Sequence, residues 1–265
     1  MYSKPFEPHT IGGVLDDAIR LYRASFRDVL ALAFIAEIPV AAQRIYLESA
    51  MQGIAANNPQ ALIAVFEQPN VWLSYLLMVL VFLVFYVAVL ANVDSVARAA
   101  PIGFGQSLGA GLRLFPRVIG MVVVSLVVLM IGLVLLVVPG IYLYGALYLA
   151  VVAIVVDDAG LLGSLATSAR LTWGHWWRSV TIYSVIIIII AIVGGVLGGV
   201  VVGIFAGIFG VRSLPSIVAN QVIAFVFGVA AMSMAPSAML SIYYDLKLRR
   251  EGSDLAERVQ ALPTR

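Results

Sequence analysis

An acidic residue and a basic residue stand inside the first long apolar run of the chain, in the stretch LALAFIAEIPVAAQR that ends at Arg44. Glu37 lies roughly nine residues into a predicted membrane-spanning helix, or about 13 Å from its start at the rise of an α-helix. An ionisable group at that depth is a candidate for binding a substrate, an ion or a proton. Arg44 follows seven residues later on nearly the same face, about 10 Å along the axis. Direct pairing therefore requires that both side chains bend or that a water bridges them.

A purely structural interpretation of this pair stays open. In it, Glu37 is protonated or hydrogen-bonded to a neighbouring helix, while Arg44 extends toward the membrane surface. Pro39 lies between the two and leaves the carbonyl of Ile35 without its helical partner, which predicts a kink.

The stretch ATSARLTWGHWWRSV, residues 166–180, gathers three of the four Trp and one of the two His. A single His without a second ligand makes a poor metal site, so His175 is interpreted as a partly solvated residue at the membrane interface. Trp and Arg suit the headgroup level of a bilayer. The predicted lipid-headgroup contacts of the whole chain are Arg20, Arg113, Arg170, Arg178, Trp173, Trp176 and Trp177.

Patterns typical of catalysis are missing from the sequence. There is no Cys, and no metal-ligand cluster, nucleophile–base pair or phosphate-binding glycine loop is visible. Asp94 and Asp245 are expected to end spans near the cytoplasmic face, and Asp157 or Asp158 to cap the helix that follows. We therefore expect a protein that is not an enzyme, with no cofactor, no metal and no nucleic-acid partner.

Composition explains which elements position these residues. Hydrophobic residues make up 62% of the 265 residues and charged residues 11%, and the mean hydropathy is +1.04. These values are typical of an integral membrane protein, whose spans need about 20 apolar residues each. Six membrane-spanning helices are predicted, at about residues 28–48, 71–94, 118–138, 141–157, 180–209 and 218–246.

The basic residues predict the orientation. Fourteen of the 16 Lys and Arg fall on the side of the two termini, and only Arg44 and Arg212 fall toward the other. Because positive residues in short loops stay in the cytoplasm, both termini are expected to be cytoplasmic in a multi-pass protein of the bacterial inner membrane.

Three amphipathic stretches precede the three predicted hairpins. They align on Arg-Leu pairs at residues 20–21, 113–114 and 170–171, with a Leu five positions before each Arg. The sequence thus predicts an all-α fold, one membrane domain over 1–265, with repeat units at roughly 10–97, 102–157 and 158–246 and a tail over 247–265. The first apolar stripe is Ile11, Val14, Leu15, Ala18, Ile19, Tyr22 and Phe26, opposite Asp16, Asp17, Arg20, Arg23 and Arg27; the third is Leu161, Leu162, Leu165, Ala169, Thr172, Trp173 and Trp176.

Glycine and proline mark further features. Gly195, Gly199, Gly203 and Gly207 recur at every fourth position and form a glycine zipper, which favours close packing by another helix of the chain, with a gate or an oligomer seam as alternatives. The spans are expected to bundle around this fifth helix. Residues 139–140, Pro-Gly, predict a tight turn between the third and fourth spans.

The sixth span and the outer loop carry smaller signals. Pro236 predicts a kink whose free carbonyls Ser233 and Ser237 satisfy. Residues 243–244, Tyr-Tyr, fit an aromatic belt. Asn58 followed by Pro59 predicts the start of a short helix that ends near residue 66.

The stretch VPGIYLYGALYLAVVAIVVDDAGLLGSLATSARLTWGHWWRSV, residues 138–180, resembles a bacterial family of polytopic membrane proteins, the membrane domain of glycerophosphoryl diester phosphodiesterase. The matching features are the Pro-Gly pair, the acidic residues after the span, and the ending RLTWGHWWR; IGGVLDDAIRLYRASFRDVL is similar to the family's start. In that family the phosphodiester chemistry belongs to a separate soluble barrel of some 250 residues. This chain has no segment for such a barrel, so the resemblance implies a membrane module of undefined role.

Two functions are expected from these observations. The first is a non-catalytic inner-membrane protein that engages membrane lipids, or that organises or regulates another membrane protein or a second copy of itself. The alternative is a small secondary transporter or channel that uses Glu37 within the membrane.

Overall fold

The computed structural model describes residues 2, 4–5, 7–51, 58–135, 137–211 and 213–260. Arg212 and Arg265, which were counted in the charge distribution, lie outside these ranges. All regular structure in the described ranges is helical. The helices are α1 (Ile11–Met51), α2 (Pro59–Phe66), α3 (Pro69–Ala97), α4 (Phe104–Leu135), α5 (Val137–Leu147), α6 (Ala150–Asp157), α7 (Leu161–Thr172), α8 (Trp176–Phe209) and α9 (Leu214–Gln260).

Six helical segments of the described chain are long and apolar enough to cross a membrane. They are Ile11–Met51, Pro69–Ala97, Phe104–Val134, Val137–Asp157, Trp176–Phe209 and Leu214–Arg250. The fourth combines α5 and α6, which are separated by a break at residues 148–149. The all-α class and the multi-pass membrane character are therefore confirmed.

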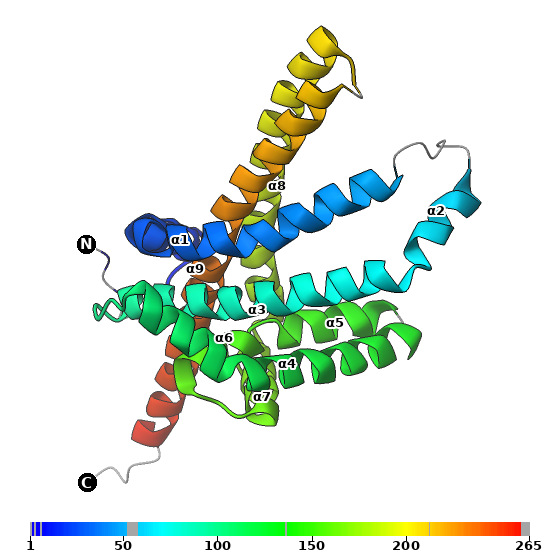
Figure 1. Ribbon diagram of the computed structural model, residues 1–265. Helices are drawn as coiled ribbons and strands as arrows, with labels where there is room; N and C mark the ends of the chain where they lie inside the picture. Colours follow the sequence, from blue (N-terminus) through cyan, green and yellow to red (C-terminus); the bar gives the residue numbers. More distant parts are fainter. Residues whose placement is uncertain are drawn as a thin grey trace.

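The helices are arranged as hairpins that diverge from a common base (Figure 1). The helices α1 and α3 run side by side, α4 and α5 form a second pair, and the α8–α9 hairpin extends away from both. The buried residues of α8 are Ser179, Ile182 and Ile186, all near its start. The prediction that the spans bundle around α8 is wrong, because α9 is the helix that packs against α1, α3 and α8.

The core lies where α1, α3, α6 and α9 meet. Its largest fully buried side chains include Tyr243, Tyr244, Leu21, Leu90 and Ile154. Alanine and glycine allow the backbones to approach closely, as at Gly111 of α4, where an added Cβ would lie 2.5 Å from a backbone carbonyl oxygen of α3.

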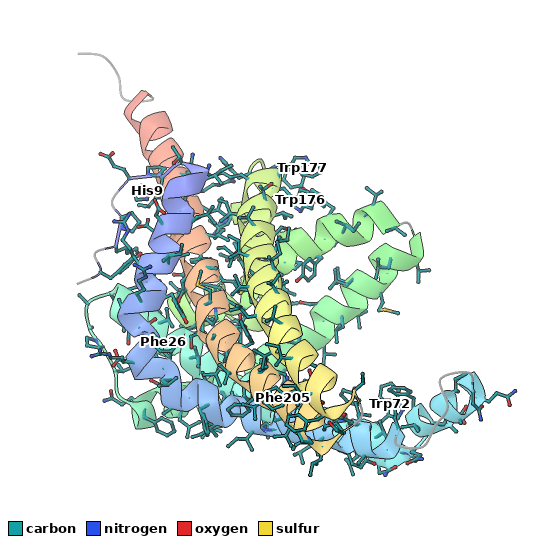
Figure 2. The ribbon with its side chains drawn as sticks, turned by 90° about the horizontal axis from the view of Figure 1, so that it is seen from above. His9, Phe26, Trp72, Trp176, Trp177 and Phe205 are labelled. Carbon is teal, nitrogen blue, oxygen red and sulfur yellow. The ribbon has the colours of Figure 1, made fainter. Side chains whose placement is uncertain are left out.

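The first two amphipathic stretches continue into the spans that follow them, within α1 and α4. Figure 2 shows that α1 nevertheless changes direction near Phe26. The buried face differs from the predicted stripe, because Asp17 is buried while Ile19 is 39% exposed. The pattern of apolar and polar residues could not show that the buried face includes Asp17, since Asp17 is buried by pairing with another segment.

The third amphipathic stretch is a separate helix and is shorter than predicted. It ends at Thr172, and Trp176 already belongs to α8, because Gly174 takes a positive φ of 81° that breaks the helix. Its buried face carries Ser168 and Thr172, while Leu162 is 68% exposed. The Ser168 hydroxyl donates to the carbonyl of Ala146 at 2.7 Å, so α7 docks on α5 through hydrogen bonds more than through a leucine stripe.

Two predicted turns are placed differently. Pro139 lies in the first turn of α5, where its missing N–H costs no helical hydrogen bond, so the connection falls before residue 137. The N-cap of α7 is Gly160, with no side-chain cap. Asp158 instead ends α6 in the left-handed region, with φ at 49°. The Asn58–Pro59 start is confirmed, because the Asn58 side chain accepts a bond from the N–H of Ala61 at 3.1 Å.

Candidate functional site

The stretch Tyr243–Asp245 of α9, with its polar partners, forms a cluster that we call the α9 cluster. The Tyr243 hydroxyl donates to Asp157 at 2.7 Å, and the Tyr244 hydroxyl donates to Asp94. Both rings are buried, at 0% and 2% exposed. The aromatic-belt interpretation is therefore wrong: these tyrosines join α9 to the ends of α6 and α3.

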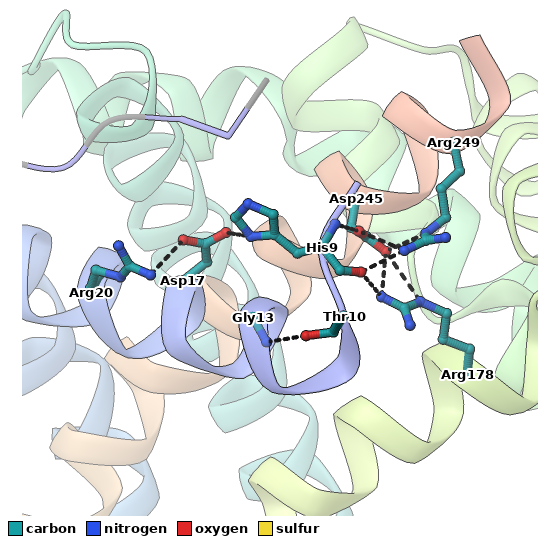
Figure 3. A network of polar contacts seen from close by, with 8 residues as sticks. All are labelled: His9, Thr10, Gly13, Asp17, Arg20, Arg178, Asp245 and Arg249. Atoms are coloured by element: carbon teal, nitrogen blue, oxygen red, sulfur yellow. Dashed lines mark hydrogen bonds and ion pairs between the residues drawn. The ribbon is translucent and has the colours of Figure 1, made fainter. Parts of the chain in front are cut away.

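Asp245 connects three segments that are far apart in the sequence (Figure 3). Its carboxylate accepts bonds from the backbone N–H of His9 at 2.9 Å, from Arg178 at 3.1 Å and from Arg249 at 3.0 Å. Both guanidinium groups also donate to the carbonyl oxygen of His9 at 2.5 Å. The carboxylate is almost fully buried, so these bonds fix the N-terminal segment and the start of α8 against α9.

The His9 side chain continues this network along α1. Its Nδ1 lies 2.7 Å from Asp17, and Arg20 lies 3.7 Å from the same carboxylate (Figure 3). This contact is an ion pair when the imidazole is protonated, and its geometry is not that of a hydrogen bond. Burial raises the pKa of Tyr2 to about 12, and the negative charge of Asp17 adds to this shift.

Arg98 closes the opposite side of the α9 cluster. Its Nε lies 2.8 Å from Asp94, and its Nη2 donates to the carbonyl of Val156 at 2.7 Å. Burial alone lowers the pKa of Arg98, but Asp94 and Tyr244 together outweigh it and raise that pKa above its ordinary value. The guanidinium therefore stays charged and ties the end of α3 to the end of α6.

A polar pocket of about 390 Å³ opens beside the α9 cluster, between α6, α7 and α9. Lys247 lies 2.7 Å from Asp157 at its wall. We call this the basic pocket, because three cations and one carboxylate surround it. Its lining residues are Asp157, Thr167, Arg170, Leu171, Tyr243, Lys247 and Arg250.

The residues predicted to contact lipid headgroups do not share one environment. Arg20 and Arg113 are exposed, and Arg170 is exposed at the basic pocket. Arg178 instead pairs with Asp245 in the interior. Trp173 and Trp177 are 68% and 78% exposed, as expected for residues at a boundary.

Trp176 is partly covered by α5. Its ring stacks on Tyr142, with centroids 5.4 Å apart, and its Nε1 donates to the carbonyl of Tyr142 at 2.9 Å. The same side chain lies against Gly145, where any Cβ would collide with it. Trp176 thus holds the start of α8 against α5.

The Oε2 atom of Glu37 lies 3.8 Å from the Nη2 atom of Arg44. That separation is within ion-pair range but is too long for a direct hydrogen bond. Glu37 is 5% exposed, and its carboxylate lies directly over Gly228 of α9. The structure therefore brings this predicted pair together.

The predicted glycine stripe faces away from the rest of the chain. No described atom lies within 4 Å of a Cβ built at the four stripe positions, Gly195, Gly199, Gly203 and Gly207. The glycines that approach α9 are Gly194, next to Phe227, and Gly198, next to Ile223. The stripe therefore does not provide packing within this chain.

Two hydroxyls near Pro236 bond differently from the prediction. Ser233 donates to the carbonyl of Val229, and Ser237 donates to the carbonyl of Ser233. The carbonyl that Pro236 leaves free belongs to Met232. Neither hydroxyl bonds to it.

No family model matches this chain, and no solved structure matches it. The resemblance at residues 138–180 therefore stays a prediction. Sequence reasoning missed the α9 cluster, although one signal was present: Asp94, Asp157 and Asp245 each follow the apolar part of a span. Several carboxylates that each follow the apolar part of a span, together with two adjacent tyrosines at the same level of another span, form the pattern that predicts such a cluster.

Proposed function

We propose that this protein is a non-catalytic membrane protein that binds anionic phospholipid headgroups through the basic pocket. The observation that carries the proposal is the composition of that pocket, where Arg170, Lys247 and Arg250 surround one carboxylate, Asp157. Three positive charges and one negative charge leave a net charge of +2, which suits a phosphate monoanion or dianion.

The position of the pocket supports a lipid as the source of the phosphate. It lies at the end of the apolar part of α6 and α9, where a spanning helix meets the headgroup region. Most of the basic residues belong to this same side, which is the cytoplasmic side by the charge rule. The membrane in question is the bacterial inner membrane, with both termini in the cytoplasm.

A threefold repeat accounts for the way the amphipathic stretches dock. When the three stretches are aligned on their Arg-Leu pairs, the residues at three matched positions are buried in every copy. The matched sets are Val14, Ser107 and Ser164; Ala18, Gly111 and Ser168; and Leu21, Leu114 and Leu171. The second set is small in each copy, which permits close approach to the helix beneath. This correspondence supports three units that are built alike.

The lipid proposal is tested by native mass spectrometry of detergent-solubilised protein with phosphatidylglycerol. We expect replacement of Arg170, Lys247 and Arg250 by Gln to weaken binding about 100-fold, at about 1 kcal/mol for each cation. The matched control replaces Arg23, Arg27 and Arg117, which are exposed elsewhere and are not among the predicted headgroup contacts, and removes the same charge. Equal losses in both triple variants would contradict a built site. Glycerol phosphate, which has the headgroup but no acyl chains, separates lipid binding from binding of a free phosphate.

Glu37 supports a second candidate, a small secondary transporter or channel. The observation is a buried carboxylate beside Arg44, in the middle of a helix that is long enough to cross the membrane. Glu37→Gln is expected to abolish solute flux in reconstituted vesicles at normal expression. Unchanged flux would exclude a role for this carboxylate in transport.

A further inference from the structure

A line of polar side chains joins α1 to α9 inside the apolar part of the protein. On α1 its side chains are those of Glu37, Arg44 and Glu48, and on α9 the side chain is that of Gln221, while Gly228 of α9 leaves the space that the Glu37 carboxylate occupies. We call this line the polar seam. We infer that the polar seam is hydrated from the α2 end and that Glu37 exchanges a proton with that side of the membrane.

The geometry of two antiparallel helices produces the polar seam. Intervals of seven and eleven residues return to nearly the same face of α1, and an interval of seven does so on α9. Gln221 donates to Glu48 at 2.6 Å at one end, and Gly228 faces Glu37 at the other. The distance from Glu37 to Glu48 is about 16 Å along α1. The polar seam therefore runs from the interior of the span toward its α2 end.

Unpartnered polar atoms along the polar seam point to water as its occupant. Among the described residues, no hydrogen-bond donor reaches the buried acceptors Glu37 Oε2 and Gln221 Oε1. Arg44 Nε and Arg44 Nη2 are buried donors without a hydrogen-bond acceptor in the described part of the chain. A polar group that stays unpaired in the interior destabilises the fold. Water is both donor and acceptor, so it is the small molecule that satisfies both kinds of atom.

The charges favour a proton over a metal ion. Arg44 lies 3.8 Å from the free oxygen of Glu37, and a metal cation bound there would meet the guanidinium charge. A proton adds no second cation to the site, because it neutralises the carboxylate itself. The Glu37 carboxylate takes the proton from a hydronium ion that arrives along the polar seam, and a water molecule is left.

The groups that face Glu37 are few among the described residues. From α1 they are Arg44 and, farther along, Glu48, while α9 provides Gln221 and Gly228, which do not titrate. The charged residues of α3 and α8, Asp94 and Arg178, are bonded within the α9 cluster. Proton exchange at Glu37 is therefore coupled mainly to Arg44.

Gly228 makes room for the carboxylate. A Cβ at this position would overlap all three terminal atoms of Glu37. Gly228→Ala is therefore expected to displace the carboxylate from the polar seam. Gly195→Ala is the matched control, since it adds the same methyl group to a spanning helix where no described atom lies within 4 Å.

The test is modification by dicyclohexylcarbodiimide, an apolar reagent that forms an adduct with protonated carboxyl groups, followed by peptide mass spectrometry. The chain has no Cys, so a single Gln60→Cys in α2 reports which side of a reconstituted vesicle carries that helix. We expect labelling at Glu37 to fall at least about tenfold when the pH on the α2 side is raised from about 5 to about 9. Raising the pH on the other side alone is expected to leave it unchanged.

Each outcome decides the inference. Labelling that follows the pH of the opposite side, or that ignores pH on both sides, would overturn it, as would the absence of label at Glu37. Gly228→Ala is expected to reduce labelling at least about fivefold, and Gly195→Ala to leave it as in the wild type. The wild-type measurement needs no substitution in the polar seam, so a variant that fails to fold does not leave the question open. The basic pocket takes no part, so loss of lipid binding leaves this result unaffected.

Discussion

Asp245→Asn tests the interpretation that one carboxylate holds three segments together. The substitution keeps the size of the side chain and one acceptor oxygen, but it removes the negative charge between Arg178 and Arg249. In the wild type this carboxylate is almost fully buried, and the side chains of the two arginines are 19% and 26% exposed. The change therefore leaves two largely covered cations without their counter-charge.

The expected loss follows from those contacts. Removing one partner of a buried ion pair costs about 3–5 kcal/mol, and the partial exposure of both arginines places this case near 3 kcal/mol. For a chain of this size, each kcal/mol lowers the Tm by roughly 2–4 °C, so a decrease of about 10 °C is expected. The substitution also weakens the attachment of His9, because its backbone N–H and carbonyl both bond to this network.

The measurement is thermal unfolding in detergent, followed by tryptophan fluorescence. Trp176 and Trp177 lie at the start of α8 beside Arg178, so they report on this region. Asp16→Asn is the control, because Asp16 is an exposed carboxylate near the start of α1 and its replacement removes the same charge. A Tm for Asp245→Asn within about 2 °C of the control would refute the reasoning, since an interior network cannot lose its charge at so small a cost.

Three further substitutions test other contacts. Gly111→Ala forces a methyl group against the carbonyl oxygen of Val84 and is expected to lower the stability by about 1–3 kcal/mol. Its control, Gly109→Ala, adds a methyl group that meets no atom and is expected to stabilise the helix by about 1 kcal/mol. Thermal unfolding measures both variants, and equal effects would contradict the close approach of α3 and α4. Ser168→Ala removes the hydrogen bond from α7 to α5 and is expected to lower the stability by about 1 kcal/mol in the same thermal unfolding assay. An unchanged stability would contradict the docking of α7 through hydrogen bonds. The folded-state pKa of Tyr2, about 12, lies above the unfolded value near 10, so its contribution is fully present below pH 10 and is lost as pH rises toward about 12. Tyr2→Phe is expected to flatten stability over that interval in alkaline unfolding curves, and an unchanged slope would contradict the burial of its hydroxyl.

The sequence was sufficient to predict which segments form helices long enough to cross a membrane. A helix satisfies its backbone hydrogen bonds internally, as lipid requires, which is why long apolar runs predicted six candidate spans. The helices that contain the first and third spans begin at residues 11 and 104, well before the predicted starts near 28 and 118, because the amphipathic stretches are continuous with them. The short helix that begins after Asn58 was also predictable, because its capping residues act locally. Which helix becomes central was not predictable. Glycines marked α8 as suited to close packing, but they do not specify the partner, and α9 packs at the centre.

The sites were predicted less completely, for a physical reason. Glu37 is conspicuous in the sequence because a carboxyl inside an apolar run is costly. His9, Asp94 and Asp157 are not conspicuous, because polar residues near the end of a span are ordinary. Their importance comes from partners at distant positions, such as Tyr244 for Asp94. Contacts between residues 86 to 236 positions apart leave no periodic pattern in a single sequence.

The helix α8 is held mainly at its first residues, so a small tilt there moves its far end by a larger distance. Bonds through Arg178 and Trp176 clamp this end, while the remainder of the helix reaches outward with few neighbours besides α9. Thirty-four residues make a rod of about 50 Å, so a tilt of only about 5° at the clamp carries the far tip sideways by about 4 Å. The contacts of Arg178 and Trp176 at the start of α8 therefore determine where the far end of this helix, about 50 Å away, comes to lie.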